Sequence, residues 1–408
     1  MVTRIDVRGL KAVRQWVVTR ELQFGVGDSI TTQDIEDAHK RLHNLSVFND
    51  AEITADSMGV VTVEVSEAWP ILPILSVGFS EGNLSDVLKD PSTFWDNVSI
   101  LLGVRHYNMT HNADQLFAFT QLGIANGFYI GYSTRWLSPK YPVAVRGRVQ
   151  YLTVTDRHAS VLDSSRHMRD NGFGLDVTTR NGGRVRLGLG TSYEYVDQED
   201  DWPAEGKTYN TIWLSPLAGL DYRDLEWWPS RGGYGEGRVN FVFGTRKFVR
   251  SQAGLRGYFP LHSYFSSRMP HRPPVLAVQI SAATSTTSTP SFAHYYFGFE
   301  QGFRGYRNVR SESAGYIVGD AELRFPITGE STYNVPFIGR WGRHWPLGLA
   351  GVVFIQRGEL QLDNTRTPLL GYGGGVYLRV PYVQLVELAL SENRDSEHEF
   401  TMRLGVGF

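Results

Sequence analysis

The sequence predicts a membrane all-β fold, a transmembrane β-barrel, preceded by a small α/β domain. From residue 69 onward, apolar and polar residues alternate at every second position, which is typical of strands with one apolar face. The polar faces carry arginine repeatedly, and tryptophan and tyrosine gather near strand ends, as in "LEWWPSRGGYG". Alternation alone fits a soluble sandwich or a membrane barrel, but an arginine-lined interior and aromatic ends favour the barrel. About sixteen such segments fit into roughly 340 residues, near the length that tilted membrane strands and their loops need.

Composition excludes several other classes of protein. The 408 residues include 40 basic and 42 acidic side chains, and this balance argues against a nucleic-acid-binding protein. The chain has no cysteine, which excludes disulfide bonds and thiolate chemistry. It also lacks the run of about 18 apolar residues that a membrane-spanning helix requires. The sequence begins directly in "VTRIDVRGL", so we expect a signal peptide or a passenger domain to precede it.

Residues 1–68 have the pattern of a domain with the element order β-α-α-β-β. A first strand is expected at Arg4–Val7, followed by a helix around Val13–Leu22. The stretch "GDSITTQDIEDAHKRLHNL" predicts a second helix, because Thr31 and Asp34 have the spacing of a capping box. The stretches "FNDAEITAD" and "GVVTVEVSE" then predict a pair of antiparallel strands.

Residues 69–408 supply the expected barrel strands. In "VAVRGRVQYLTV", valine and tyrosine occupy one face while arginine and glutamine occupy the other. The arginines of such faces either form an anion-favouring lumen surface or meet the counter-charges of a loop that fills the lumen. They are Arg146, Arg148, Arg184, Arg186, Arg238, Arg250 and Arg256.

The two parts together resemble the BamA/TamA superfamily of outer-membrane proteins, also called the bacterial surface antigen family. Residues 1–68 look like one POTRA module of that family, with "GD" before the second helix and an "L…VF" ending. Three barrel segments resemble family motifs: "DYRDLEWWPSRGG" (221–233), "FRGYR" (303–307) in the long sixth loop, and "GDAELRFP" (319–326) in the strand that follows. The family's C-terminal assembly signal corresponds to the aromatic end of the chain. The resemblance therefore implies one POTRA module in the periplasm and a 16-stranded antiparallel barrel in the outer membrane.

The resemblance also assigns the site residues. In the family, the arginine of the sixth loop folds back into the barrel and meets an acidic residue on the following strand. Arg304 has that role here and Glu322 is its matching partner, whereas Gln356 stands where relatives have a second acid. We therefore expect a weaker clamp, or compensation by Asp320. The full set comprises the loop tip (Phe303, Arg304, Gly305, Tyr306), the lumen partners (Glu322, Asp320, Gln356), the 221–233 motif (Asp221, Arg223, Asp224, Pro229, Gly232) and the C-terminal signal (Met402, Leu404, Val406, Phe408).

The function implied by the resemblance is insertion of other barrels into the outer membrane, or transport of protein across it. Partners would be outer-membrane lipids and unfolded barrel proteins, with a homodimer possible. A client would add as a strand to the POTRA sheet edge around residues 60–66. The seam between a first strand near Asn97–Tyr107 and a last strand at Glu399–Phe408 would open for client strands. A second hypothesis is the transporter half of a patatin-like phospholipase that carries a fused passenger, and a third is a plain porin.

Two further motifs have simpler interpretations. "GFSEG" (78–82) matches the nucleophile elbow of hydrolases, but no α/β sheet follows it, so Ser80 is interpreted as part of a linker and no enzyme is expected. His39 and His43 have a metal-ligand spacing on the second helix. No third ligand is close in the sequence, so they are assigned to a solvated helix face. We predict no metal and no cofactor.

Overall fold

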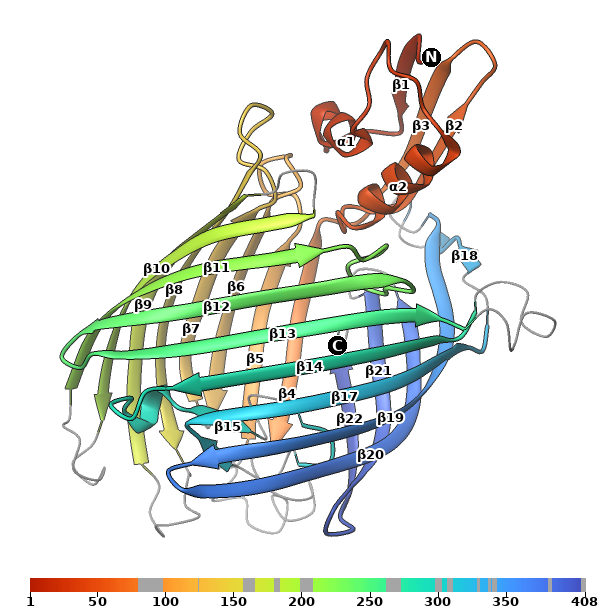
Figure 1. Cartoon of the computed structure of the whole chain (residues 1–408). Coiled ribbons are helices and arrows are strands. Elements are labelled where there is room, and N and C mark those ends of the chain that lie inside the picture. Colours follow the sequence, from red (N-terminus) through yellow and green to blue (C-terminus); the bar gives the residue numbers. More distant parts are fainter. Residues whose placement is uncertain are drawn as a thin grey trace.

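The computed structural model of the chain describes residues 1–79, 98–123, 125–156, 166–179, 184–198, 208–261, 273–297, 303–306, 311–328, 331–336, 339, 343–380 and 384–404. Within them, a small domain sits at one end of a closed barrel (Figure 1). We call the barrel end that carries the small domain the near end, and the opposite end the far end.

The small domain has the predicted order of elements. It consists of β1 (Arg4–Arg8), α1 (Gln15–Leu22), α2 (Thr32–His43), β2 (Phe48–Ala55) and β3 (Val60–Glu67). The sheet order is β1-β3-β2, with β1 parallel and β2 antiparallel to β3. The expected client edge at residues 60–66 is therefore wrong: those residues form the central strand, which is paired on both sides.

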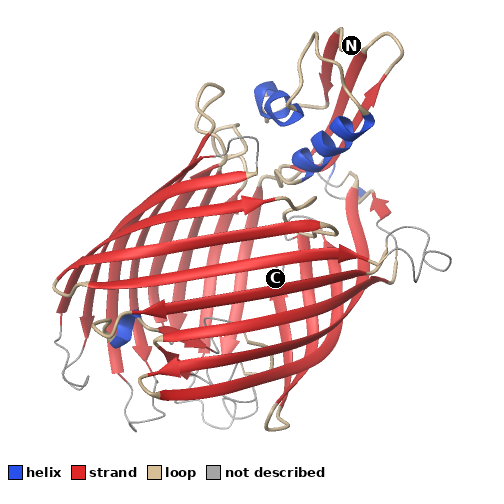
Figure 2. Cartoon of the chain, viewed as in Figure 1, coloured by secondary structure: helices blue, strands red, loops and turns tan. Residues whose placement is uncertain are grey.

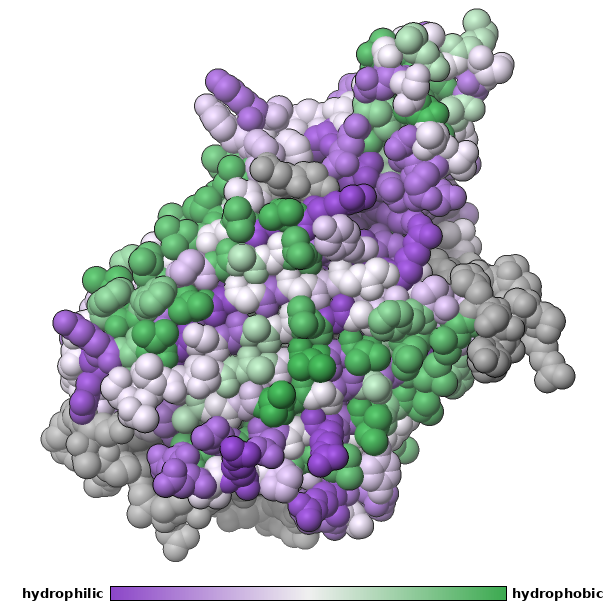
Figure 3. Space-filling view, viewed as in Figure 1, coloured by the Kyte–Doolittle hydropathy of each residue, from purple (hydrophilic) through white to green (hydrophobic). Residues whose placement is uncertain are grey.

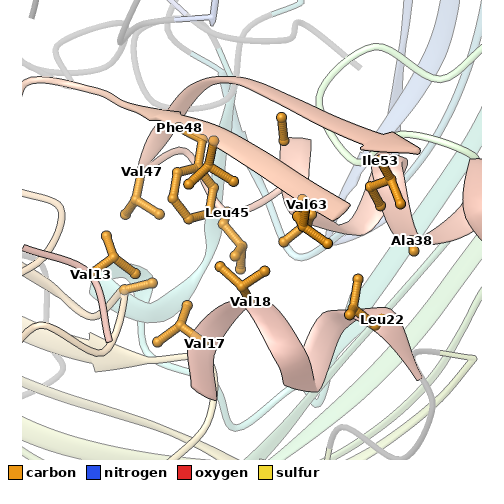
Figure 4. Packing of buried hydrophobic residues seen from close by; sticks show 14 of the residues in the cluster. Val13, Val17, Val18, Leu22, Ala38, Leu45, Val47, Phe48, Ile53 and Val63 are labelled. Atoms are coloured by element: carbon orange, nitrogen blue, oxygen red, sulfur yellow. The ribbon is translucent and has the colours of Figure 1, made fainter. Parts of the chain in front are cut away.

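Local sequence explains both helices. The Thr31 side chain accepts from the backbone of Asp34, whose side chain accepts from the backbone of Thr31, so the expected capping box is complete. Hydrogen bonds from the side chain and backbone of Thr31 lower the pKa of Asp34. The apolar faces of both helices pack on the sheet, and Figure 4 shows Val17, Val18 and Leu22 of α1 facing Val63 of β3. None of the described helices has the length and apolar composition needed to cross a bilayer.

The barrel is one antiparallel sheet that closes on itself (Figure 2). Its order contains seventeen strands, of which β18 is a three-residue segment beside β19, so sixteen long strands form the wall. Its first half comprises β4 (Ile71–Phe79), β5 (Val98–His106), β6 (Gln115–Gly123), β7 (Ala125–Thr134), β8 (Val143–Asp156), β9 (Arg166–Thr179), β10 (Val185–Gln198) and β11 (Thr208–Asp221). Its second half comprises β12 (Gly232–Gly244), β13 (Phe248–Pro260), β14 (Val275–Ser285), β17 (Gly315–Pro326), β18 (Ser331–Tyr333), β19 (Trp345–Leu362), β20 (Thr365–Val380), β21 (Gln384–Asn393) and β22 (His398–Leu404).

Alternation sets the two faces of the wall. In β17, the inward residues from Val318 to Arg324 are buried at every second position, while Ile317 is exposed on the outside. The same pattern exposes Leu187 and Leu189 of β10. Figure 3 shows hydrophobic residues spread over the outer face of the strands, with hydrophilic residues gathered near the small domain and at the far end. This arrangement suits a wall that faces lipid.

The first wall strand differs from the expectation. It is β4, formed by "ILPILSVGF", whereas the residues near Asn97–Tyr107 form the second strand, β5. The seam that closes the barrel therefore joins β4 to β22. Ser80 follows β4 and lies outside the described residues.

Among the described residues, the small domain contacts four near-end turns. Each of these turns makes at least one direct contact with α1, the residue after α2, β2 or the segment before α1. The contacts are Arg14 N to His111 O at 3.0 Å, the Arg20 guanidinium on the Trp136 ring at 5.6 Å, Glu226 N to Asn44 Oδ1 at 3.0 Å, and Asn49 Nδ2 to Arg343 O at 3.0 Å.

Candidate functional site

The sixth far-end loop (286–314) folds into the barrel. At its base, η2 (Ser291–Ala293) leads into β15 (Tyr295–Phe297), which pairs with β16 (Ser311–Ser313). The described tip, residues 303–306, turns at Gly305, whose φ of +86° lies in the left-handed region that favours glycine. The side chains of Phe303, Arg304 and Tyr306 are all buried. The tip is thus enclosed by the wall.

Arg304 is held by two carboxylates from different strands. Its Nη2 donates to Glu322 Oε1 on β17 and, at 2.9 Å, to Glu387 Oε1 on β21. The side chain of Arg304 is 1% exposed and both glutamates are fully buried. Charge-assisted hydrogen bonds in such a water-poor setting are strong and geometrically specific. The guanidinium therefore ties the loop tip to two separate strands.

The two remaining predicted partners, Gln356 and Asp320, bind each other and lie beside Arg304. Gln356 Oε1 accepts from the backbone N–H of Arg304 at 2.9 Å, and Gln356 Nε2 donates to Asp320 Oδ2 at 2.8 Å. Asp320 lies 3.7 Å from Arg304 Nη1. The amide at 356 thus holds the loop backbone, while the second close carboxylate is Glu387, which sequence reasoning missed.

Aromatic rings and glycines shape the space around the tip. The Arg304 guanidinium stacks 4.1 Å from the centroid of the Phe354 ring, and Tyr306 Oη accepts from the backbone of Leu370 at 3.3 Å. A Cβ on Gly371 would lie only 2.0 Å from the carbonyl oxygen of Arg304. Asn393 Nδ2 donates to the Gly305 carbonyl at 3.0 Å. Gly371 on β20 therefore makes room for the loop tip.

A second segment enters the lumen from the near end. We call this turn between β11 and β12, residues 222–231, the inward turn. Asp221 accepts two hydrogen bonds from Arg223, at 2.9 and 2.8 Å, and Asp224 accepts from the Ser230 side chain and from backbone N–H groups. Pro229 is buried, and Gly232 follows with a φ of +97°. The predicted motif residues thus fold the turn onto itself.

The inward turn reaches the wall that also holds the sixth loop. The Arg379 guanidinium lies 3.8 Å from the Trp227 ring centroid, and the Arg324 guanidinium lies 4.7 Å from Trp228. Arg324 Nε donates to Glu322 Oε2 at 2.8 Å, and Glu322 also accepts from Arg304. One buried carboxylate therefore joins the inward turn, through Arg324, to the tip of the sixth loop.

Several other lumen arginines lie close to acids or aromatic rings. Arg186 Nη2 donates to Asp221 at 3.0 Å, and Arg238 lies 3.7 Å from Asp176. Arg250 stacks 4.3 Å from the centroid of Tyr295 at the base of the sixth loop. Of the two alternatives, these contacts favour neutralised arginines, with counter-charges that come mainly from the wall and its turns.

The predicted C-terminal signal is described only in part. Met402 points outward from β22 and is exposed, and Leu404 is the last residue of that strand. Val406 and Phe408 lie outside the described residues.

Some site residues could have been found in the sequence and others could not. Glu387 is the one charged residue in "VQLVELALS", on the inward face of an otherwise apolar strand, which is a usable signal. Arg324 has a similar signal beside Glu322. Trp228 lies in the 221–233 motif and Gly371 in a glycine run, but their contacts with Arg324 and Arg304 depend on which segments meet inside the barrel.

The chain is similar to one protein family and to several solved structures. The family model described as "Omp85 superfamily domain" matches residues 114–381. Among solved structures, BamA from Haemophilus ducreyi lacking POTRA domains 1–3 is 12% identical with a TM-score of 0.56, over 99% of this chain and 83% of that one. CdiB from Escherichia coli is 12% identical with a TM-score of 0.59, over 100% and 73%, and CdiB from Acinetobacter baumannii is 12% identical with a TM-score of 0.56, over 99% and 74%. A comparison with curated proteins gives no match.

Proposed function

The chain belongs to the Omp85 superfamily of outer-membrane barrels, and on this premise we propose that it inserts other barrel proteins into the outer membrane or carries a polypeptide across it. The observation that carries the proposal is the buried Arg304, held by Glu322 and Glu387 inside the lumen. A plain porin needs neither this clamp nor a small domain on its near end. The proposed insertion or transport consists of binding and conformational change, with no covalent step.

The small domain would receive the client. Its outer strands β1 and β2 each have one unpaired edge within the described sheet, and an extended chain can add to such an edge through backbone hydrogen bonds. The chain has no native cysteine, so single cysteines at Asp6 and Glu52 can report on each edge separately. Cross-linking of a client to one of these positions identifies the edge, and cross-linking to neither contradicts this step.

The seam between β4 and β22 would be the place where a client strand joins the wall. Exposed backbone in hydrocarbon is costly, so an opened seam has to find a partner strand. Pro73 lies in β4; proline cannot donate to the strand ladder, so it is tolerated mainly where a strand edge needs no donor. A disulfide engineered across β4 and β22 is expected to stop client folding, and reduction is expected to restore it.

The clamp would keep the sixth loop inside the lumen during this cycle. Replacing Arg304 with alanine leaves Glu322 and Glu387 without their shared cation, so the loop is expected to undock. Proteolysis of the loop should then be faster and single-channel conductance higher, in a barrel that still inserts. Arg366→Ala is the control, because Arg366 pairs with Glu359 at an exposed position away from the clamp. Unchanged conductance and unchanged loop cleavage in Arg304→Ala would count against the clamp.

The proposed function itself is tested by reconstitution. The purified protein is placed in liposomes, and the folding rate of an unrelated barrel protein is measured by its gel shift. We expect faster folding than in empty liposomes, and a smaller acceleration with Arg304→Ala. Equal rates with and without the protein would contradict the insertion function, while transport of a polypeptide into the vesicles would favour the second branch of the proposal.

The passenger hypothesis rests on the single small domain, which a fused secretion anchor would also have. Sequencing the reading frame upstream of Met1 separates the two hypotheses. A lipase domain in the same frame favours a phospholipase that carries its own transporter, and a signal peptide favours the insertion factor.

A further inference from the structure

Two histidines of α2 point their rings toward each other. The Nε2 atoms of His39 and His43 are 3.2 Å apart, and their ring centroids are 4.4 Å apart with the planes tilted by 56°. His39 is exposed, and the side chain of His43 is 20% exposed. The pair is therefore open to small solutes.

This separation suits joint coordination of one metal ion. Imidazole nitrogens bind zinc at about 2.0–2.1 Å, so two of them in a tetrahedral site stand about 3.3 Å apart. The observed 3.2 Å needs almost no adjustment. Histidines spaced by four residues on one helix face are also a known way of chelating zinc.

The fold supplies a third ligand that the sequence did not reveal. Asp50 at the start of β2 has its Oδ1 3.9 Å from His43 Nε2. His344, on the turn before β19, has its Nδ1 3.7 Å from Asp50 Oδ2. Within the described part of the chain, no three such groups already stand in position to hold a metal. The side chain of Asp50 is 39% exposed and can rotate toward the histidine pair.

We propose that His39 and His43 chelate a divalent transition-metal cation, with Asp50 as third ligand and water completing the shell. Two imidazoles and one carboxylate suit Zn²⁺ and its first-row neighbours better than Mg²⁺ or Ca²⁺, which prefer oxygen ligands alone. The site lies beside the contact between β2 and the 343–344 turn, where the small domain meets the barrel.

The alternative is a hydrogen bond between the two rings, with one ring donating and the other accepting. That arrangement also gives a distance near 3.2 Å. It makes no demand for a metal, so the two interpretations differ in a direct binding measurement.

The experiment uses the full chain in detergent, purified without a polyhistidine tag, and Co²⁺ as a coloured substitute for Zn²⁺. We expect one Co²⁺ per chain to produce a visible absorption band, which added Zn²⁺ abolishes. Binding should weaken in acid, where protons compete with the metal for the imidazoles. His39→Ala and His43→Ala are each expected to lose the band, and Asp50→Asn to keep a weaker one.

His398→Ala is the matched control. His398 also lies near one carboxylate, 3.8 Å from Glu392, but it is at the far end of the barrel, and no second histidine contacts it among the described residues. This variant should bind Co²⁺ as the wild type does. Absence of the band in the wild type, or its persistence in both His39→Ala and His43→Ala, would overturn the proposal. Far-UV circular dichroism checks that the variants are folded.

Discussion

At the scale of single residues, the buried Arg304 depends on the charges around it. Glu322 and Glu387 are fully buried beside it and together offset its desolvation. Removing one partner from a buried ion pair typically costs about 3–5 kcal/mol, because the remaining charge has no compensation. Because Arg304 has two glutamate partners, the loss of one leaves the other to compensate its charge, so the cost is smaller than for a single pair.

This sharing predicts a graded series for the carboxylates. Glu387→Gln keeps the shape but removes one charge, and we expect it to destabilise the docked loop by about 1.5–3 kcal/mol. Protease cleavage of the sixth loop should fall between that of the wild type and that of Arg304→Ala. Glu359→Gln is the control, because Glu359 pairs with Arg366 at 3.2 Å in an exposed setting. Cleavage of Glu387→Gln at the wild-type rate would show that Glu322 alone holds the loop.

Gly371 predicts a purely steric effect on the same loop. A Cβ at this position would meet the Arg304 carbonyl oxygen, so Gly371→Ala should push the tip away and raise conductance without altering any charge. The matched substitution is Gly319→Ala on β17, where the nearest neighbouring atoms to the new Cβ would be 4.0 Å away. Equal conductance in the two variants would contradict the steric explanation.

The sequence was sufficient for part of this site. Arg304 and Glu322 could be paired in advance, because the family resemblance implies an acidic partner for the loop arginine on the next strand and alternation places Glu322 on the inward face. Glu387 is 83 residues away from Arg304 in the sequence. Whether the two side chains meet depends on how far each strand is shifted relative to its neighbours around the wall. Periodicity fixes the face of a strand but not this shift, so the partner across the lumen had to come from the fold.

At the scale of elements, a buried glutamate holds the segment before α1 in place. Glu67, at the end of β3, accepts hydrogen bonds from the backbone N–H groups of Lys11, Ala12 and Val13 at 2.8–2.9 Å. It is 8% exposed. This contact holds the segment before α1 against the sheet.

Loss of that carboxylate should loosen one element rather than the whole domain. Glu67→Ala leaves three backbone donors without their acceptor, and we expect a loss of about 1–3 kcal/mol in the stability of the small domain. Hydrogen exchange at residues 11–13 and in α1 measures it. Glu64→Ala, on an exposed position of the same strand, is the control. Exchange that rises equally in both variants would argue against an anchoring role.

Elements were predicted best where their signals are local. The α2 helix has a capping box and a clear apolar face, and both are present as expected. In contrast, β4 was not recognised as the first wall strand, which was expected near Asn97–Tyr107, with Ser80 in a linker before it. Pro73 argues against a central strand but is acceptable next to a seam, and only the closed topology shows that β4 is there.

At the scale of the whole molecule, the small domain is connected to the sixth loop by continuous contacts. Asn44, the residue after α2, accepts from the backbone of Glu226 in the inward turn, and Trp228 of that turn packs on Arg324. Arg324 shares Glu322 with Arg304. A change at the domain contact can therefore reach the loop tip without passing along the chain.

Trp228→Ala tests this connection. We expect the sixth loop to become more sensitive to protease, although the substitution lies on the other side of the network, because Arg324 then loses a packing partner. Trp136→Ala is the control: Trp136 is also on a near-end turn and contacts Arg20 of the small domain. If Trp228→Ala leaves loop cleavage unchanged, the two inward segments act independently.

The two inward segments both lean on the wall formed by β17 to β21, and this has a consequence for the rest of the interior. Beside them, a cavity of about 440 Å³ is lined by Arg146, Asp176, Arg186 and Arg238, and a second of about 420 Å³ is lined by Arg256 and Gln279 together with Phe303 of the loop tip. Undocking of the tip would therefore enlarge a charged cavity, so leakage of salt would report on the position of the sixth loop.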